Sequence, residues 1–274
     1  YNIPSLNGTV NISSNSFMTA ALLSSGKILT WGKEKDGVGS LGHGTAYAAD
    51  SGTSIPTEVV GITNAVDVYV SYNSSAPTTV AILSDGKAMK WGKGASAVGD
   101  QTVAGPTPIE ITQINHPAEK AKQIVMEYYG GLFVLLESGL IRAINVHPYV
   151  YGGSNTNGGI MPEITNVIQI QEGSNSAYAL CSDGSVWSWG YNYVSRGNLG
   201  QPDIGINGHQ YQENGTSYYR PPTVISGVGP GSGAIKIVSR QYGCMILFSD
   251  GTVKGFGEND NDVLLQGNTT DQTS

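Results

Sequence analysis

Side chains that can act as acids, bases or nucleophiles are sparse in this sequence and form no familiar catalytic pattern. The four histidines, His43, His116, His147 and His209, all fall in loop-like stretches rich in Gly, Pro or Asn. We interpret them as solvent-exposed loop residues. The sequence has no Gly-x-Ser-x-Gly elbow, no His-Glu-x-x-His helix and no phosphate-binding loop. We therefore predict a protein that is not an enzyme and has no catalytic residues.

Metal and cofactor sites are not predicted either. The acidic run from Glu258 to Asp262 offers carboxylate oxygens, but it lacks the Gly and the distal Glu of a helix-loop-helix calcium site. Cys181 and Cys244 lie in apolar, strand-like segments, and no Cys and His residues have metal-site spacing. We expect two buried free thiols, no metal and no cofactor.

Tyrosines gather in three long stretches, at positions 33–54, 146–159 and 191–220, which hold eight of the fifteen tyrosines. Tyrosine combines a large contact area with a polar tip at a low cost in rotamer entropy, so it is favoured in binding loops. Arginine can anchor a protein partner. The alternative is that these tyrosines pack the loops onto the sheets below them. The predicted ligand-binding residues are Tyr149, Tyr151, Tyr191, Tyr193, Arg196, Tyr211, Tyr218, Tyr219 and Arg220.

The elements that would position these loops recur along the chain. A hairpin pattern of three apolar residues, a polar pair and a glycine occurs five times, with the glycine at Gly26, Gly86, Gly139, Gly184 and Gly251. Pairs such as Asp85-Gly86 favour the positive φ angles of tight hairpin turns. A bulky apolar residue stands five positions after each glycine, and a Gly or Asn follows it. These residues are Trp31, Trp91, Ile144, Trp189 and Phe256.

Two further strands are expected in each repeat. Upstream of each hairpin, apolar residues spaced by two indicate a strand, and we align Ile12, Val68, Val125, Ile170 and Ile237 at one position of it. A proline near β-branched residues, as at Pro56 and Pro222, indicates an edge strand, because proline cannot donate to a ladder. Each repeat therefore predicts a four-stranded antiparallel sheet with two apolar faces, and stacking the sheets radially would cover those faces.

Composition and charge narrow the function. Charged residues make up 13% of the chain, the net charge is −7 and no basic cluster is present, so nucleic-acid binding is disfavoured. The longest apolar stretch, from Ile124 to Ile141, contains two glutamates and two adjacent glycines, so no membrane insertion is expected.

The repeat resembles that of the regulator of chromosome condensation (RCC) family, in the pattern aL-x-x-D-G-x-V-x-x-W-G followed by N…LG. Members of that family usually form seven-bladed β-propellers. The resemblance implies an all-β propeller of four-stranded antiparallel blades, with five repeat units in residues 1–274 as one domain. Two blades lying outside the chain, a smaller ring and an open arc remain as alternatives. We favour missing blades, and we expect a fragment or a processed part of a longer chain.

Three functions follow as hypotheses. The first is a recognition module on a secreted, phage or other particle surface that presents Tyr-rich loops to a protein or glycan partner. This hypothesis implies an extracellular or particle-surface location, and it allows assembly into a larger particle. The second is an intracellular regulatory partner of a GTPase or an enzyme, of the exchange-factor or inhibitor type. The exchange activity of the family is not carried over, because the Gly-His pair usual before the hairpin is missing. The third, a propeller lyase or glycosidase, would need paired carboxylates that the sequence does not place.

Overall fold

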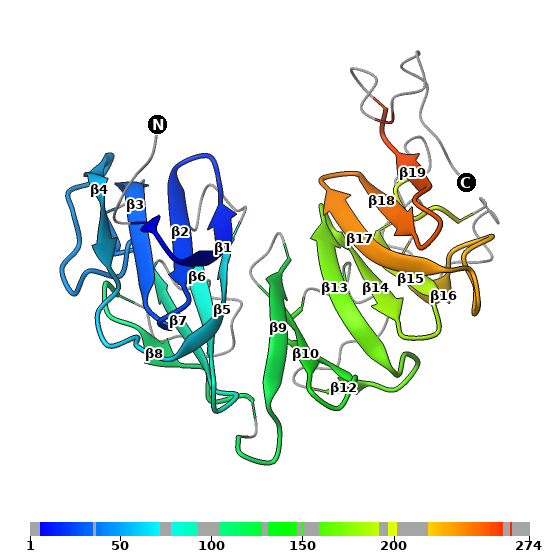
Figure 1. Cartoon of the computed structure of the whole chain (residues 1–274), viewed down its shortest axis with the longest axis horizontal. Coiled ribbons are helices and arrows are strands. Elements are labelled where there is room, and N and C mark those ends of the chain that lie inside the picture. The colour runs from blue at the N-terminus through cyan, green and yellow to red at the C-terminus, as the bar shows by residue number, and fades with distance from the viewer. Residues whose placement is uncertain are drawn as a thin grey trace. The chain divides into compact units, whose positions relative to one another are not determined.

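The computed structural model describes an all-β chain in which sheet follows sheet (Figure 1). It describes residues 6–34, 37–71, 78–92, 105–114, 116–127, 131–146, 150, 159–191, 197–201, 219–259 and 264. The chain divides into two compact units, residues 1–137 and 138–274. The boundary falls inside the third repeat, so each unit is described by itself.

Unit 1 holds two complete four-stranded antiparallel sheets and one further strand pair. The first repeat has the order β1-β2-β3-β4 and the second β5-β6-β7-β8, while β9 and β10 of the third repeat pair with each other. The strands are β1 (Thr9–Ser14), β2 (Met18–Leu23), β3 (Ile28–Glu34), β4 (Ser51–Glu58), β5 (Ala65–Val70), β6 (Thr78–Leu83), β7 (Ala88–Gly92), β8 (Ile109–Glu110), β9 (Ala121–Met126) and β10 (Leu132–Leu136).

Unit 2 continues the same plan. The strands β11 and β12 of the third repeat pair, the fourth repeat has the order β13-β14-β15-β16, and the fifth has three described strands in the order β17-β18-β19. The strands are β11 (Ile141–Ile144), β12 (Ile160–Met161), β13 (Val167–Gly173), β14 (Ser176–Cys181), β15 (Val186–Tyr191), β16 (Tyr219–Val224), β17 (Ala234–Arg240), β18 (Gly243–Phe248) and β19 (Val253–Gly257).

The hairpin predictions are confirmed. All five turn glycines have φ between 79° and 90°, which L side chains adopt rarely. The N–H of Gly86, for example, donates to the carbonyl of Leu83 at 2.8 Å, which closes the turn. The residue after each bulky apolar group also has positive φ, from 48° at Asn145 to 117° at Gly32. The prolines Pro56 and Pro222 lie in β4 and β16, which are the outer strands of their sheets as expected.

One alignment from the sequence is wrong by one residue. In β9 the residue opposite Val134 is Ile124, whereas Val125 lies opposite Phe133. Ile124 is therefore the counterpart of Val68, which lies opposite Ala81. The shift arises because the connection from β9 to β10 is one residue longer than its counterparts in the fourth and fifth repeats, so counting the same number of residues back from the turn glycine stops one residue short.

Successive repeats pack on each other in the same way in both units. In unit 1, β5 packs against β1 and β2, and β9 packs against β5 and β6; in unit 2, β17 packs against β13 and β14. Apolar side chains of both partners form the core between them. The clusters include Leu22, Ile28 and Val68 in unit 1, and Leu180, Val186 and Ile237 in unit 2. The two cysteines are buried free thiols, as predicted.

The Leu-Gly motifs that follow β3 and β15 are part of this packing. A Cβ atom on Gly42, which has φ of 75°, would lie 2.7 Å from Nε1 of Trp91 in the next repeat. A Cβ atom on Gly200, with φ of 59°, would lie 2.9 Å from the ring of Phe256 in the next repeat. Both glycines thus leave room for the aromatic residue that follows in the neighbouring sheet.

Candidate functional site

The connection from β3 to β4 is organised around the buried carboxylate of Glu34. Its Oε2 accepts hydrogen bonds from the N–H groups of Gly39 and Tyr47, both at 3.0 Å, and its Oε1 accepts one from Leu41 at 3.2 Å. Glu34 is fully buried. A buried carboxylate is tolerated when backbone donors satisfy its lone pairs. This residue therefore fixes the path of a connection whose outer residues, such as Thr45, are exposed.

His43 joins the same connection to the sheet. Its Nε2 lies 2.9 Å from the hydroxyl oxygen of Thr30 on β3, and its Nδ1 lies 3.2 Å from the hydroxyl of Tyr47. The two rings meet edge to face, with centroids 5.8 Å apart. Burial lowers the pKa of His43, while hydrogen bonds to the backbone of Thr57 and Thr30 and the charge of Glu34 oppose that shift. His43 is half-buried with two side-chain partners, so the interpretation as a solvent-exposed loop histidine is wrong for this residue.

The fourth repeat places different residues in the same arrangement. Nε2 of Gln201 donates to the hydroxyl of Ser188 at 2.7 Å, as the counterpart of His43 and Thr30. Both Leu-Gly motifs accept a bond from that hydroxyl group, at the carbonyl of Leu41 or Leu199. Arg220 on β16 donates from a guanidinium nitrogen to Oε1 of Gln201 at 2.9 Å. The base of the connection is therefore a built polar cluster in both of these repeats, with different side chains in each.

Of the predicted ligand-binding residues, the structure describes three. Tyr191 ends β15 and is half-buried, and its carbonyl accepts a bond from Nδ2 of Asn198 at 2.9 Å. Tyr219 begins β16. Arg220 is 3% exposed, which makes it a packing residue at the base of the connection rather than an exposed anchor. Tyr149, Tyr151, Tyr193, Arg196, Tyr211 and Tyr218 lie outside the described residues. The Tyr-rich binding set thus stays a prediction.

A second polar position recurs on the first strand of every repeat. Asn11, Asp67, Gln123, Gln169 and Lys236 occupy equivalent register positions, each just after a bulge in the first hairpin. Three of these side chains, those of Asn11, Asp67 and Gln169, link neighbouring repeats. Nδ2 of Asn11 donates to Oδ1 of Asp67 at 2.7 Å, and the side chain of Gln169 both donates to and accepts from the backbone of Ile237.

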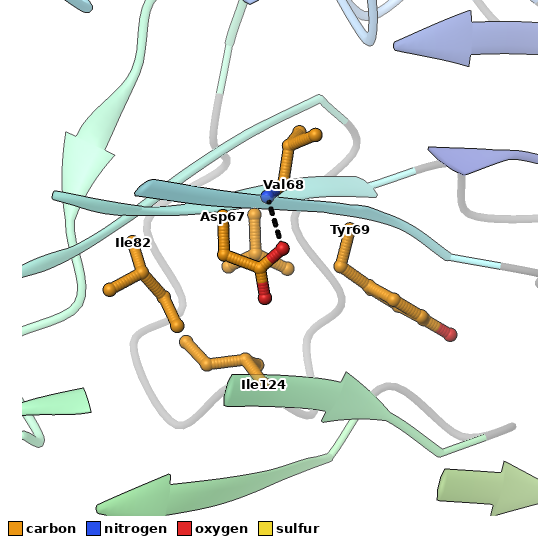
Figure 2. Close-up of a pocket in the computed structure, with 6 residues that line it drawn as sticks. Asp67, Val68, Tyr69, Ile82 and Ile124 are labelled. Atoms are coloured by element: carbon orange, nitrogen blue, oxygen red, sulfur yellow. Dashed lines mark hydrogen bonds between the residues drawn. The ribbon is translucent and has the colours of Figure 1, made fainter. Parts of the chain in front are cut away.

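Asp67 borders a small hollow that Val68, Tyr69, Val80, Ile82 and Ile124 also line (Figure 2). Burial raises the pKa of Asp67, while the N–H of Val68 and the amide of Asn11 oppose the shift. The space along the hollow is about 140 Å³ even with the open solvent at its mouth included, whereas sites for organic ligands typically measure about 300–1,000 Å³. It is therefore a gap between packed strands rather than a substrate site.

Catalysis and metal binding find no support in these clusters. In the described part of the chain, no group of three or more His, Cys, Asp or Glu side chains could hold a metal ion. The hydroxyl of Thr30 beside the His43 ring donates its hydrogen to the carbonyl of Leu41, so the ring is not placed to take a proton from it. The hydrogen bonds of Glu34, His43 and Gln201 hold the connections in defined positions on their sheets.

The exact network at Glu34 predicts a measurable stability effect. We expect Glu34→Gln to lower the free energy of unfolding by about 2 kcal/mol, because a charged acceptor shared by three backbone donors is replaced by a single amide oxygen. Glu58→Gln is the control on the same sheet, since Glu58 forms an exposed ion pair with Lys27 and such pairs contribute about 0–1 kcal/mol. Urea denaturation of both variants checks this, and equal losses would contradict the role given to Glu34.

The lowered pKa of His43 predicts a dependence of stability on pH. In the unfolded chain the pKa of His43 is about 6.5, and in the folded chain it is lower. The stabilising contribution of the neutral ring is therefore fully present above about pH 6.5, and it is lost as the pH falls through the folded pKa. We expect His43→Gln, which copies the residue found in the fourth repeat, to be less sensitive to pH between about 7 and 5 than the wild type. Thermal unfolding across that range measures the difference, and parallel pH profiles would refute it.

Comparisons with known proteins agree with the repeat and with the sheets. No family model matches the chain. The RCC1 domain-containing protein RUG3, mitochondrial, of Arabidopsis thaliana is 27% identical over 183 residues, which cover 63% of this chain and 40% of that protein. The E3 ubiquitin-protein ligase HERC2 of Mus musculus is 23% identical over 251 residues, which cover 92% of this chain and 4% of that protein.

A solved structure extends the likeness to the fold. The crystal structure of Prp20p from Saccharomyces cerevisiae, described with its binding properties to Gsp1p and histones, matches with a TM-score of 0.75 at 16% identity. The match covers 97% of this chain and 62% of the yeast chain. The chain therefore spans less than two thirds of the length of these two relatives and of the yeast protein.

The predicted extracellular or particle-surface location is wrong. The plant relative is a mitochondrial protein by name, and the yeast protein binds Gsp1p and histones, neither of which fits a secreted adhesin or a phage appendage. Glycan binding and particle assembly likewise gain no support from these proteins, whereas binding to other proteins does. Among the described residues, no helix has the length and hydropathy needed to cross a bilayer.

Three observations converge on one family. The five hairpins repeat at equivalent register positions, the sheets are four-stranded and antiparallel wherever a repeat is described in full within one unit, and the similar proteins carry RCC1-type repeats or the RCC1-type fold. The chain resembles RCC1-type repeat proteins in its sequence repeats, and it has the fold of an RCC1-type β-propeller.

Proposed function

We propose that this chain is a non-enzymatic protein-interaction module that regulates the protein it binds. Residues 1–274 act in this proposal as one propeller domain. The observation that carries it is the connection from β3 to β4, where a buried carboxylate holds three backbone N–H groups and leaves the outer residues exposed. A loop fixed in this way loses little conformational entropy on binding, which favours recognition.

The partner docks, in this proposal, on the connections that follow the third strand of the repeats. Tyr47 is half-buried against His43 in the first of them. The longest connection carries the predicted residues Tyr193, Arg196, Tyr211, Tyr218 and Tyr219. Aromatic and arginine side chains on such loops provide the contacts that dominate protein interfaces.

The charge of the chain favours a basic partner. The net charge is −7 and the isoelectric point is near 5.0. Three of the lysines are neutralised by ion pairs with carboxylates on neighbouring strands or loops: Lys27 with Glu58, Lys33 with Asp50 and Lys87 with Glu110. The similar yeast protein binds histones as well as Gsp1p. Complementary charge accelerates association and suppresses wrong partners.

A binding measurement with purified proteins tests this function. Immobilised chain is presented with core histones and with a panel of small GTPases, and release of a fluorescent guanine nucleotide is followed for each GTPase that binds. We expect a protein partner whose affinity falls as salt rises, and we expect Tyr218→Ala with Tyr219→Ala to weaken binding at least about tenfold. Ile168→Ala, an exposed change on β13, is the control. Unchanged binding by the tyrosine variant would remove the loops from the site.

Accelerated nucleotide release would favour the exchange-factor form of this function, because binding to Gsp1p is a property of the yeast structural neighbour. Binding without accelerated release would favour an adaptor or inhibitor form. Failure to bind any protein in either class, with the chain folded, would count against a regulatory role of this kind.

A further inference from the structure

The hydrogen bonds of His43 have a fixed direction. The hydroxyl of Thr30 donates its one hydrogen to the carbonyl of Leu41, so its oxygen, 2.9 Å from Nε2 of His43, must accept from the ring. Nε2 therefore carries the proton of the neutral ring, and Nδ1 is an acceptor. The hydroxyl of Tyr47, 3.2 Å from Nδ1, must then donate to it. A chain of donors thus runs from Tyr47 through the ring and Thr30 to Leu41.

The fourth repeat has the same chain of donors without a group that titrates near neutral pH. A guanidinium nitrogen of Arg220 donates to Oε1 of Gln201 at 2.9 Å, and Nε2 of Gln201 donates to the hydroxyl of Ser188 at 2.7 Å. That hydroxyl donates to the carbonyl of Leu199 at 2.6 Å. An amide, like a neutral imidazole, accepts at one end and donates at the other, but it takes up no proton in this range. The first repeat therefore differs from the fourth in having a titratable link.

His43 also lies where the connection from β3 to β4, which we call the first connection, meets the second repeat. The N–H of Gly44, the next residue, donates at 2.9 Å to the carbonyl of Pro106 in the connection from β7 to β8. Gly39 packs on the same proline, since a Cβ atom on it would lie 2.3 Å from Cα of Pro106. The contacts of His43 therefore bear on the connections of two neighbouring repeats.

A proton on Nδ1 of His43 would reverse the bond to Tyr47. The Tyr47 hydroxyl would have to turn from donor to acceptor within a contact in which both rings are half-buried. The carboxylate of Glu34 on β3 and the backbone of Thr57 on β4 favour the charged ring, but burial outweighs them and lowers the pKa of His43. The charged groups of Lys33 and Asp50 pair with each other at 2.9 Å. The arrangement seen here is therefore that of the neutral ring.

We propose that His43 is a pH-sensitive switch: the neutral ring holds the first connection against β3 and against the second repeat, and the protonated ring releases it. A second consequence rests on the function proposed above. Where a partner docks on these connections, its binding weakens as the pH falls below about 6.5. The base of the fourth repeat's connection stays in place over the same range, because Gln201 makes the equivalent bonds without titrating.

Nuclear magnetic resonance of the chain with isotopically labelled histidine tests the direction of the bonds. The signals of His43 are identified by their loss in His43→Gln. They should show a protonated Nε2 and an unprotonated Nδ1 at neutral pH, with a titration midpoint below about 6.5. Tyr47→Phe removes the donor to Nδ1 and should raise that midpoint by about half a pH unit. A neutral ring protonated at Nδ1, or a midpoint that Tyr47→Phe leaves unmoved, would overturn the proposal.

Amide hydrogen exchange measures the release itself. After correction for the intrinsic exchange rate, protection of the Gly44 and Tyr47 amides should fall about threefold or more between pH ~7.5 and ~5.5 in the wild type. In His43→Gln the fall should be absent. His116→Gln is the matched control and should behave as the wild type, because it changes a half-buried histidine that contacts a different turn, at the carbonyl of Asp85. Equal behaviour of the wild type and His43→Gln would contradict the switch.

The effect on binding is measured with the core histones and small GTPases of the preceding test, at the same two pH values. For a protein that binds, the wild type should lose about threefold or more affinity beyond the loss seen with His43→Gln. Equal losses in the two proteins would overturn the regulation of binding. If no protein binds at either pH, the proposed function fails, whereas the exchange measurement still decides whether His43 is a switch.

Discussion

Replacing Trp91 with alanine is expected to lower the free energy of unfolding by about 3–5 kcal/mol, the range for a large buried aromatic side chain. Trp91 is fully buried and belongs to the core between the first two repeats. Trp31 occupies the same position in its own repeat, opposite Thr19 as Trp91 is opposite Thr79, but it is only partly buried. Trp31→Ala should therefore lower stability by roughly half as much or less.

Urea denaturation of the two tryptophan variants, followed by far-ultraviolet circular dichroism, measures this difference. The comparison holds the residue type and the strand position constant, while the burial of the side chain differs. Equal losses for Trp31→Ala and Trp91→Ala would mean that the contact between repeats contributes little to the burial of this position.

The second large effect is expected at Gly42. Gly42→Ala should lower the free energy of unfolding by about 2–4 kcal/mol, which combines about 1–2 kcal/mol for an L residue at positive φ with overpacking against the indole of Trp91. Gly61→Ala is a close control, because Gly61 has φ of 73°, near the 75° of Gly42, and a Cβ atom there would meet nothing within 4 Å. The control should show the backbone penalty alone.

The same comparison is available in unit 2. A Cβ atom on Gly200 would clash with the ring of Phe256, whereas a Cβ atom on Gly227, which has φ of 74°, would meet nothing within 4 Å. Chemical denaturation of the four alanine variants should give a larger loss for Gly42 and Gly200 than for their controls. Equal losses of unfolding free energy in all four variants would mean that positive φ alone accounts for the cost of replacing these glycines. The Leu-Gly motif would then play no part in packing the aromatic residue of the next repeat.

The sequence was sufficient to predict the hairpins because their determinants are local. A polar pair and a glycine specify each turn, and alternation over a few residues specifies each strand. The position of Ile124 could not be obtained by counting, because one extra residue between β9 and β10 shifts the register. Register is set by pairing across the sheet, which the spacing of a single strand does not contain.

The polar clusters at the base of the connections escaped prediction for a related reason. Nothing near His43 in the sequence indicates that its ring reaches Thr30, thirteen residues away, or that Glu34 is buried. Gly-rich sequence suggests solvated loops, and only the folded connection shows that donors from Gly39 and Tyr47 converge on one carboxylate. The repeat itself offered a signal, because Gln201 and His43 both stand two residues after the leucine of a Leu-Gly motif. In the structure both side chains contact a hydroxyl group on the third strand.

Arg220 illustrates the limit of composition as a guide to binding. An arginine in a Tyr-rich stretch is a reasonable anchor for a partner. In the structure it lies on β16, 3% exposed, with Gln201 as one of its partners. Its neighbour in sequence, Tyr219, begins the same strand. Residue type pointed to this connection as a binding site, which stays a prediction, whereas the burial of Arg220 at its base needed coordinates.

The first and fourth repeats are equivalent sheets, and each receives the aromatic residue of the next repeat at its Leu-Gly turn. A double-mutant cycle between Gly42→Ala and Trp91→Leu tests this most directly, because trimming the indole should relieve the clash that the new methyl group creates. We predict a coupling free energy of about 1 kcal/mol or more, and the same sign for Gly200→Ala with Phe256→Leu. Additive effects within about 0.5 kcal/mol in both pairs would contradict the equivalence of the repeats.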